Sequence, residues 1–280
     1  MTFIPGFEHT SAEMLLSSHV RLCVLTDVVH GEVLPSVDAA PKSTVLDAAV
    51  QGSLIRALAW GLSLKKLEEV YDFQAQSAGC RALLEIVVDL ALLTGGAQPA
   101  EKLKAWEDCC KFSEAEKALA SGPGQPQGVD AAQRVHIKRN RTDHDKALKK
   151  YWPGKTVQPM RWTGNGLAKD ARAVDKLPHV PSMKLGTLMR DHYARLNWAI
   201  HGSGVLLARS LGPTTFPGVS IFAVGLSFDL LANVVRLSLT HFGLFDKRWE
   251  ERIYMAKTSG PVEMYRRKLE AIATKAEQTP

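Results

Sequence analysis

The sequence predicts an all-α protein, built as a bundle of several helices. Apolar residues recur at helical spacing through most of the chain, period-2 alternation is scarce, and no Asn-Gly or Asp-Gly hairpin lies between β-branched runs. With 280 residues, 45% of them hydrophobic and 23% charged, the chain has the composition of a globular protein and can bury a sizeable core. We expect a single all-helical domain over residues 1–280, with N-terminal helices in 1–120, a flexible linker at 121–128 and further helices in 129–280.

The N-terminal helices are predicted from apolar stripes and from the residues that begin and end them. Pro35 and Pro41 predict a loop after the first helix, and Gly95-Gly96 ends the fourth. The stretch SGPGQPQG that follows the fifth has the composition of a flexible linker. The five expected helices are Ser11–His30, Ser43–Leu62, Leu64–Tyr71, Phe73–Thr94 and Glu101–Ala120.

The second half of the chain predicts six helices by the same criteria. A break is expected at Asn140–Thr142 in the first of them, and Pro261 is expected to separate the last two. The expected helices are Val129–Tyr151, Thr163–Val174, Met183–His201, Val219–Phe242, Lys247–Lys257 and Pro261–Lys275.

No membrane span or export signal is expected. The most apolar stretch, Ile221–Leu239, is interrupted by Asp229, Asn233 and Arg236. The first residues lack the basic and apolar regions of a signal peptide, so the expected location is the cytoplasm.

The sequence shows no pattern of a metal or cofactor site. The four cysteines have no CxxC spacing and are expected to be small buried residues. HExxH, an aspartate-rich loop and a GxGxxG turn after a strand do not occur. We therefore expect neither a metal nor a cofactor.

The positive charge of the chain is concentrated in one segment. The net charge is +6, yet residues 134–161 alone hold nine Lys or Arg against two Asp, a net charge of +7. Aromatic residues are interleaved with these charges, which favours contact with a nucleic-acid backbone and stacked bases. A solvated helix face is the alternative. The candidate substrate-binding residues in this segment are Arg139, Arg141, Lys149 and Lys150.

The stretch from 188 to 204, LMRDHYARLNWAIHGSG, combines an apolar stripe with several chemically capable side chains. Arg195 offers a bidentate fork to phosphate oxygens, and His201 can move a proton near neutral pH. Asn197 could orient either partner. Arg190 and Tyr193 on the same helix are candidate substrate-binding residues.

The spacing Arg195–five residues–His201 resembles the motif of the helical HEPN superfamily, an arginine followed four to six residues later by a histidine. The segments 81–93, 161–171 and 193–203 resemble more narrowly an uncharacterised bacterial HEPN-like family. The resemblance implies a HEPN-like core with additional N- and C-terminal helices. It also implies a metal-independent endoribonuclease of a toxin or phage-defence system, with Arg195, His201 and Asn197 as catalytic residues. RNA, a second copy of the chain and an antitoxin or defence partner are the implied partners.

A structural reading of the same residues stays open. His201 near a helix end would be favourable against the helix dipole, and Arg195 could pair with Asp191 four residues earlier. Arg81 and Glu85 have the spacing of an ion pair, which we expect to be buried and to fix helix register, with a role in the site as the alternative. Leu196 occupies the place where the superfamily has a polar residue, which favours a non-catalytic helical module that binds nucleic acid or protein.

Overall fold

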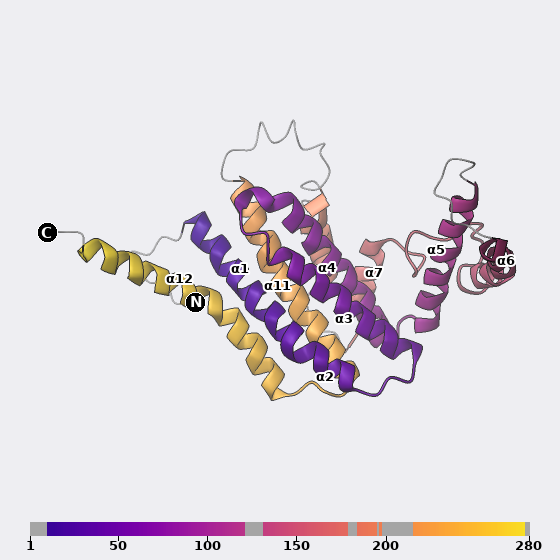
Figure 1. The fold of residues 1–280 in the computed structure, drawn as a ribbon, viewed down its shortest axis with the longest axis horizontal. Coiled ribbons are helices and arrows are strands. Elements are labelled where there is room, and N and C mark those ends of the chain that lie inside the picture. Colours follow the sequence, from indigo (N-terminus) through magenta and orange to yellow (C-terminus); the bar gives the residue numbers. More distant parts are fainter. Residues whose placement is uncertain (1–9, 121–130, 179–183, 195, 198–214, 278–280) are drawn as a thin grey trace.

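A computed structural model describes residues 10–120, 131–178, 184–194, 196–197 and 215–277. Throughout these ranges the regular elements are helices, so the predicted all-α class is confirmed (Figure 1). The bundle of long helices lies on one side of the molecule, and a pair of helices stands apart from it on the other.

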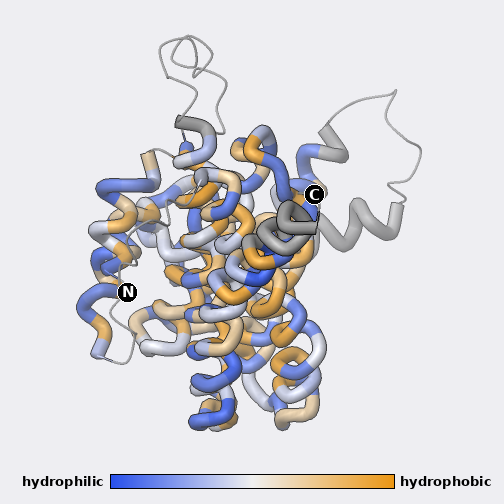
Figure 2. Tube along the Cα trace, turned by 90° about the vertical axis from the view of Figure 1, so that its left-hand side faces the viewer, coloured by the Kyte–Doolittle hydropathy of each residue, from blue (hydrophilic) through white to orange (hydrophobic). Residues whose placement is uncertain are grey.

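Helix α11 (Thr215–His241) is the centre of the bundle. It packs against α4 (Phe73–Thr94), α1 (Ser11–Val28) and α3 (Val45–Leu64), and the apolar residues of these helices form one continuous core (Figure 2). Among the described residues, α11 from Pro217 is the one helix long and apolar enough to cross a membrane. Two thirds of its most apolar stretch, 67%, is buried inside the bundle, as in the core helix of a globular protein.

The boundaries of these helices follow from their capping residues. Thr10 and Thr44 form capping boxes at the starts of α1 and α3 with an acidic residue three positions later. Helix α4 ends where predicted: Gly96 has φ of 67°, and the next amide, that of Ala97, donates to the Leu92 carbonyl at 3.0 Å.

The expected loop after the first helix is wrong. The chain continues through a π-helical turn, η1 (Val29–Val33), into α2 (Leu34–Ala39), where Pro35 lies in the first turn. Pro35 donates no backbone N–H, and it lies directly after the π-helical turn, where the regular i→i−4 pattern is already interrupted. The helix expected at Leu64–Tyr71 is reduced to the 3-10 turn η2 (Val70–Asp72).

The last two expected helices form one, α12 (Lys247–Glu277), with Pro261 in its interior. Proline removes one backbone hydrogen bond, but α12 packs along α1, and Ile253 and Met264 on either side of the proline are buried. The contact is close, since a Cβ built on Gly260 would lie 2.0 Å from the Ser17 carbonyl oxygen.

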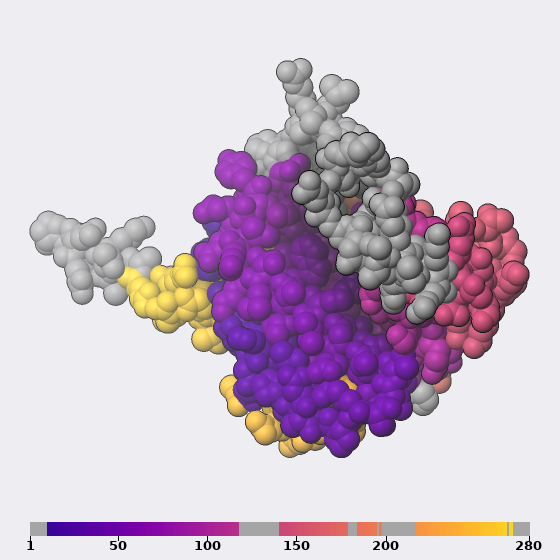
Figure 3. Space-filling model, turned by 45° about the vertical axis from the view of Figure 1, so that its right-hand side comes forward, coloured from indigo at the N-terminus to yellow at the C-terminus, as the bar shows by residue number. Residues whose placement is uncertain are grey.

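Helices α5 (Ala100–Ala120) and α6 (Ala131–Tyr151) pack on each other beside the bundle, as Figure 3 shows from the side. Their small apolar cluster consists of Cys109, Leu148 and Trp152. The break expected near Asn140 is absent because packing on α5 overrides the modest cost of Asn and Thr in a helix.

Three short elements complete the side of the bundle that faces this pair. Helix α7 (Leu167–Val174) packs on α4 and on α8 (Leu185–Leu188). A second π-helical turn, η3 (Met189–Tyr193), follows α8 directly. These elements bring two distant parts of the chain onto one face of α4.

Candidate functional site

Three charged residues form a line along the otherwise apolar helix α4. Arg81, Glu85 and Asp89 are spaced four residues apart, which places them on one face, while the apolar residues around them are buried. Their side chains are partly accessible, with 32% of Arg81, 35% of Glu85 and 21% of Asp89 exposed. We refer to Arg81, Glu85 and Asp89 as the polar stripe of α4.

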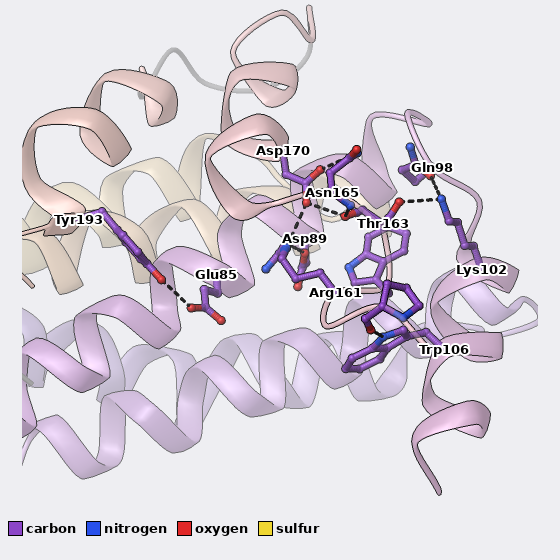
Figure 4. Close-up of polar contacts among 12 residues, drawn as sticks. Glu85, Asp89, Gln98, Lys102, Trp106, Arg161, Thr163, Asn165, Asp170 and Tyr193 are labelled. Atoms are coloured by element: carbon purple, nitrogen blue, oxygen red, sulfur yellow. Dashed lines mark hydrogen bonds and ion pairs between the residues drawn. The ribbon is translucent and has the colours of Figure 1, made fainter. Parts of the chain in front are cut away.

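The first two residues of the polar stripe contact the segment that holds the predicted motif. Arg81 Nε donates to Glu85 Oε1 at 3.1 Å. The Tyr193 hydroxyl donates to the same oxygen at 3.3 Å (Figure 4). The Arg81 guanidinium lies over the Tyr193 ring, 5.3 Å from its centroid. Burial, and then the negative charge of Glu85, raise the pKa of the Tyr193 phenol, so the hydroxyl keeps its proton as a donor.

The third residue of the stripe belongs to a more buried ionic cluster. Arg161 donates through Nη2 to Asp89 Oδ1 at 2.5 Å and through Nε to Asp170 Oδ2 at 3.1 Å. Asp170, only 3% exposed, also accepts from Thr163 Oγ1 at 2.7 Å and from Asn165 Nδ2 at 3.2 Å. Figure 4 shows these side chains converging on the two carboxylates.

The loop that supplies Arg161 is held by Trp106 of α5 and by Trp152, which directly follows α6. Trp152 Nε1 donates to the Trp162 carbonyl at 2.9 Å, and Trp106 Nε1 donates to the Pro159 carbonyl at 2.8 Å. Lys102 Nζ adds a bond to the Thr163 carbonyl at 2.9 Å. The α5–α6 pair is thereby fastened to the same face of the bundle as the polar stripe.

Burial and charge act against each other at Asp89. Burial raises the pKa of its carboxyl, and the neighbouring Arg161 guanidinium lowers it. Two carboxylates sharing one guanidinium leave the cluster with a surplus of negative charge. This arrangement is better suited to holding α4, the loop and α7 together than to binding a phosphate.

The sequence-predicted motif residues are only partly described. Arg195 and His201 lie outside the described residues. Asn197 is half-buried, and its Oδ1 has no hydrogen-bond partner within the described part of the chain. Arg190 is exposed and bonded to Asp191 at 2.7 Å.

The expected basic surface is smaller than the sequence count implies. Arg161 faces inward and is neutralised by two aspartates, so it does not belong to that surface. Arg141 is exposed and lies 3.8 Å from Glu116 of α5, and Lys149 and Lys150 are exposed at the end of α6. The side chain of Arg139 lies outside the described part.

A separate pocket of about 450 Å³ lies between α5 and α6. Its wall includes Phe112 and His144, whose ring centroids are 4.7 Å apart, and the buried thiol of Cys109. Among the described residues no three His, Cys, Asp or Glu side chains gather where they could hold a metal ion.

Comparisons with known proteins give no assignment for this chain. It matches no protein-family profile, no curated protein and no solved structure. Any function therefore has to be argued from its own residues.

The sequence reasoning identified the Arg81–Glu85 pair but missed Asp89 and Asp170. Their signal was weak, since a single aspartate within an apolar helix is common. The partner of both, Arg161, lies 72 residues from Asp89 along the chain.

Proposed function

We propose that the chain is a metal-independent endoribonuclease of the HEPN type, with Arg195 and His201 as its catalytic pair and Asn197 as their polar helper. The observation that carries the proposal is the bond from Tyr193 to Glu85. It joins the segment that leads into the motif to the partly accessible polar stripe of the central helix. A polar contact of this kind provides a rigid base for a reactive group.

The buried amide oxygen of Asn197 also supports the proposal. It is one of eight buried side-chain atoms that have no hydrogen-bond partner within the described residues, and a buried acceptor without a hydrogen bond costs free energy. A substrate hydroxyl or a catalytic side chain would satisfy it.

The proposed reaction needs no metal. His201 takes the proton of the ribose 2′-hydroxyl, the 2′-oxygen forms a bond to phosphorus, and the bond from phosphorus to the 5′-oxygen breaks. The leaving 5′-oxygen takes up a proton from water, and protonated His201 returns its proton to the solvent. Arg195 stabilises the charge on the non-bridging oxygens through its planar fork.

The proposal extends to how the RNA is held and where the protein acts. Arg141, Lys149 and Lys150 on α6, with Arg190 of η3, would contact phosphates of the strand. The setting we propose is a cytoplasmic toxin or phage-defence system, with the chain as a homodimer and an antitoxin or defence protein as its partner.

Cleavage of RNA in EDTA by purified protein tests the proposal. Wild type should cleave, and Arg195→Ala and His201→Ala should each lose activity by at least about a hundredfold. The matched controls Arg56→Ala and His30→Ala change exposed residues of the same types and should cleave like wild type. Equal cleavage by all four variants would exclude the assigned catalytic pair.

One observation favours a second function, a non-catalytic module that binds RNA through the basic end of α6. Leu196 is fully buried, 0% exposed, at the position where the HEPN pattern places a polar residue. Salt-dependent RNA binding without cleavage by wild type, lost in Lys149→Ala/Lys150→Ala, would support this module over the enzyme.

A further inference from the structure

We propose that Arg81, Glu85 and Tyr193 form a clamp that sets the register of the motif segment, which makes all three positioning residues of the site. As a statement about catalysis this rests on the proposed function. The clamp itself is argued from contacts between described residues.

The π-helical turn η3 is what makes register an issue. Each i→i+5 turn accommodates one more residue than an α-helical turn. One residue corresponds to 100° of rotation in an α-helix. Because η3 covers Met189–Tyr193, the extra residue lies directly before Ala194, Leu196 and Asn197, the described residues that lead into the motif.

Both ends of η3 are fastened to the bundle. Met189, its first residue, is only 7% exposed and packs into the core. Tyr193, its last residue, is fixed by the hydrogen bond to Glu85 and by the Arg81 guanidinium over its ring. A π turn has poorer geometry than an α-helix and persists where tertiary contacts hold it.

The clamp differs from an ordinary ion pair within a helix. Arg81 and Tyr193 donate to the same oxygen of Glu85, so the carboxylate connects α4 to a segment 108 residues away. An i,i+4 pair one third exposed contributes little to a helix by itself. A hydrogen bond to an ionised carboxylate is stronger than a neutral one, and it fixes the phenol in position.

Two variants separate the clamp from a helix-stabilising role. Tyr193→Phe keeps the ring under Arg81 and removes only the hydroxyl. The exchange Arg81→Glu/Glu85→Arg keeps an i,i+4 ion pair in α4, in the more favourable order, but moves the carboxylate one turn, about 6 Å, from the phenol. The exchange Lys247→Glu/Glu251→Lys, at another i,i+4 pair, is the matched control.

The first measurement is amide hydrogen exchange over 184–194, which needs no activity. We expect exchange in this segment on the order of tenfold faster in Tyr193→Phe and in the Arg81/Glu85 exchange variant, with α4 unchanged. The second is RNA cleavage, in which kcat should fall on the order of 10- to 100-fold with KM unchanged, because small displacements of reacting groups cost rate. The thermal midpoint and the control variant should match wild type.

The outcomes separate the clamp from the proposed function. If the amide hydrogens of 184–194 exchange at the wild-type rate in Arg81→Glu/Glu85→Arg, and this variant cleaves RNA like wild type, the clamp is overturned and the ribonuclease assignment stands. If wild type does not cleave RNA, the ribonuclease and with it the catalytic role of the clamp are overturned, and hydrogen exchange alone then decides whether the clamp holds η3.

Discussion

Arg161→Met is expected to destabilise the fold strongly, because it leaves two carboxylates without their shared cation. Arg161, Asp89 and Asp170 are 16%, 21% and 3% exposed, so water screens the cluster poorly. Breaking a buried ion pair by removing one partner costs 3–5 kcal/mol, and partial access to Asp89 favours the lower end, about 3 kcal/mol. For a chain of this length that corresponds to a fall in Tm of roughly 6–12 °C.

The same cluster predicts how the stability lost in Arg161→Met depends on pH. Burial already raises the pKa of Asp89, and removing Arg161 takes away the charge that opposes this rise. A carboxyl with a raised pKa in the folded state binds protons on folding, so its penalty is present at high pH and falls as the pH drops through that pKa. The destabilisation of Arg161→Met should therefore be smaller at pH 5 than at pH 7.

Urea denaturation followed by circular dichroism measures both effects. The variant Asp89→Asn/Arg161→Met/Asp170→Asn removes the whole set of charges and should recover much of the lost stability. Arg266→Met, at an exposed arginine with two glutamate partners, should leave the midpoint unchanged. A loss below about 1 kcal/mol for Arg161→Met, or the same loss at both pH values, would refute the electrostatic account.

Two further predictions concern glycines and acid stability. Gly260→Ala should lower Tm and detach α12 from α1, because the added Cβ would meet the Ser17 carbonyl. Gly52→Ala, with open space around the added Cβ, should raise the free energy of unfolding by about 0.5–1 kcal/mol. Equal thermal midpoints for the two variants would contradict this contrast. At the start of α3 the backbone N–H of Ser43 holds the pKa of Asp47 well below its usual range. Because this pKa is lower in the folded state, ionised Asp47 stabilises the fold above the unfolded-state pKa near 4, and this stabilisation is lost as the pH falls through the folded-state pKa. Asp47→Asn should therefore flatten the acid limb of the stability curve. An acid limb as steep as that of wild type would argue against a stabilising role for Asp47 in the capping box of α3.

The helices could be predicted where local pattern and packing agree. Helix α4 has a nearly continuous apolar run and a Gly-Gly end, and the structure places it at the predicted Phe73–Thr94. The prediction was wrong at Pro35 and Pro261, where a proline was taken as a break. Pro35 follows a π-helical turn that already interrupts the regular hydrogen-bond pattern, and the packing of α12 along α1 offsets the bond lost at Pro261.

The candidate site could be predicted only in its local part. The Arg81–Glu85 pair follows from four-residue spacing, and the structure confirms the contact at 3.1 Å, although the two side chains are about one third exposed and not buried as expected. Tyr193 bonds to Glu85 although the two lie 108 residues apart in the sequence, and no local sequence pattern predicts a contact between such distant residues. Arg161 was counted with the basic surface because its neighbours in sequence are basic, while its partners lie on other helices.

The π turn before the motif was equally hidden. A helical wheel drawn through residues 183–201 assumes 3.6 residues per turn throughout, and η3 breaks that assumption at Met189–Tyr193. An unbroken wheel therefore gives the wrong faces for Ala194, Leu196 and Asn197, the described residues directly after the turn.

The chemistry of the cleaved RNA ends tests the central claim most directly. RNA incubated with wild type in EDTA should yield 2′,3′-cyclic phosphate and 5′-hydroxyl ends by mass spectrometry, because the 2′-oxygen is the proposed nucleophile, and His201→Ala should yield none. Products with 3′-hydroxyl and 5′-phosphate ends, or cyclic ends formed equally well by His201→Ala, would contradict the account.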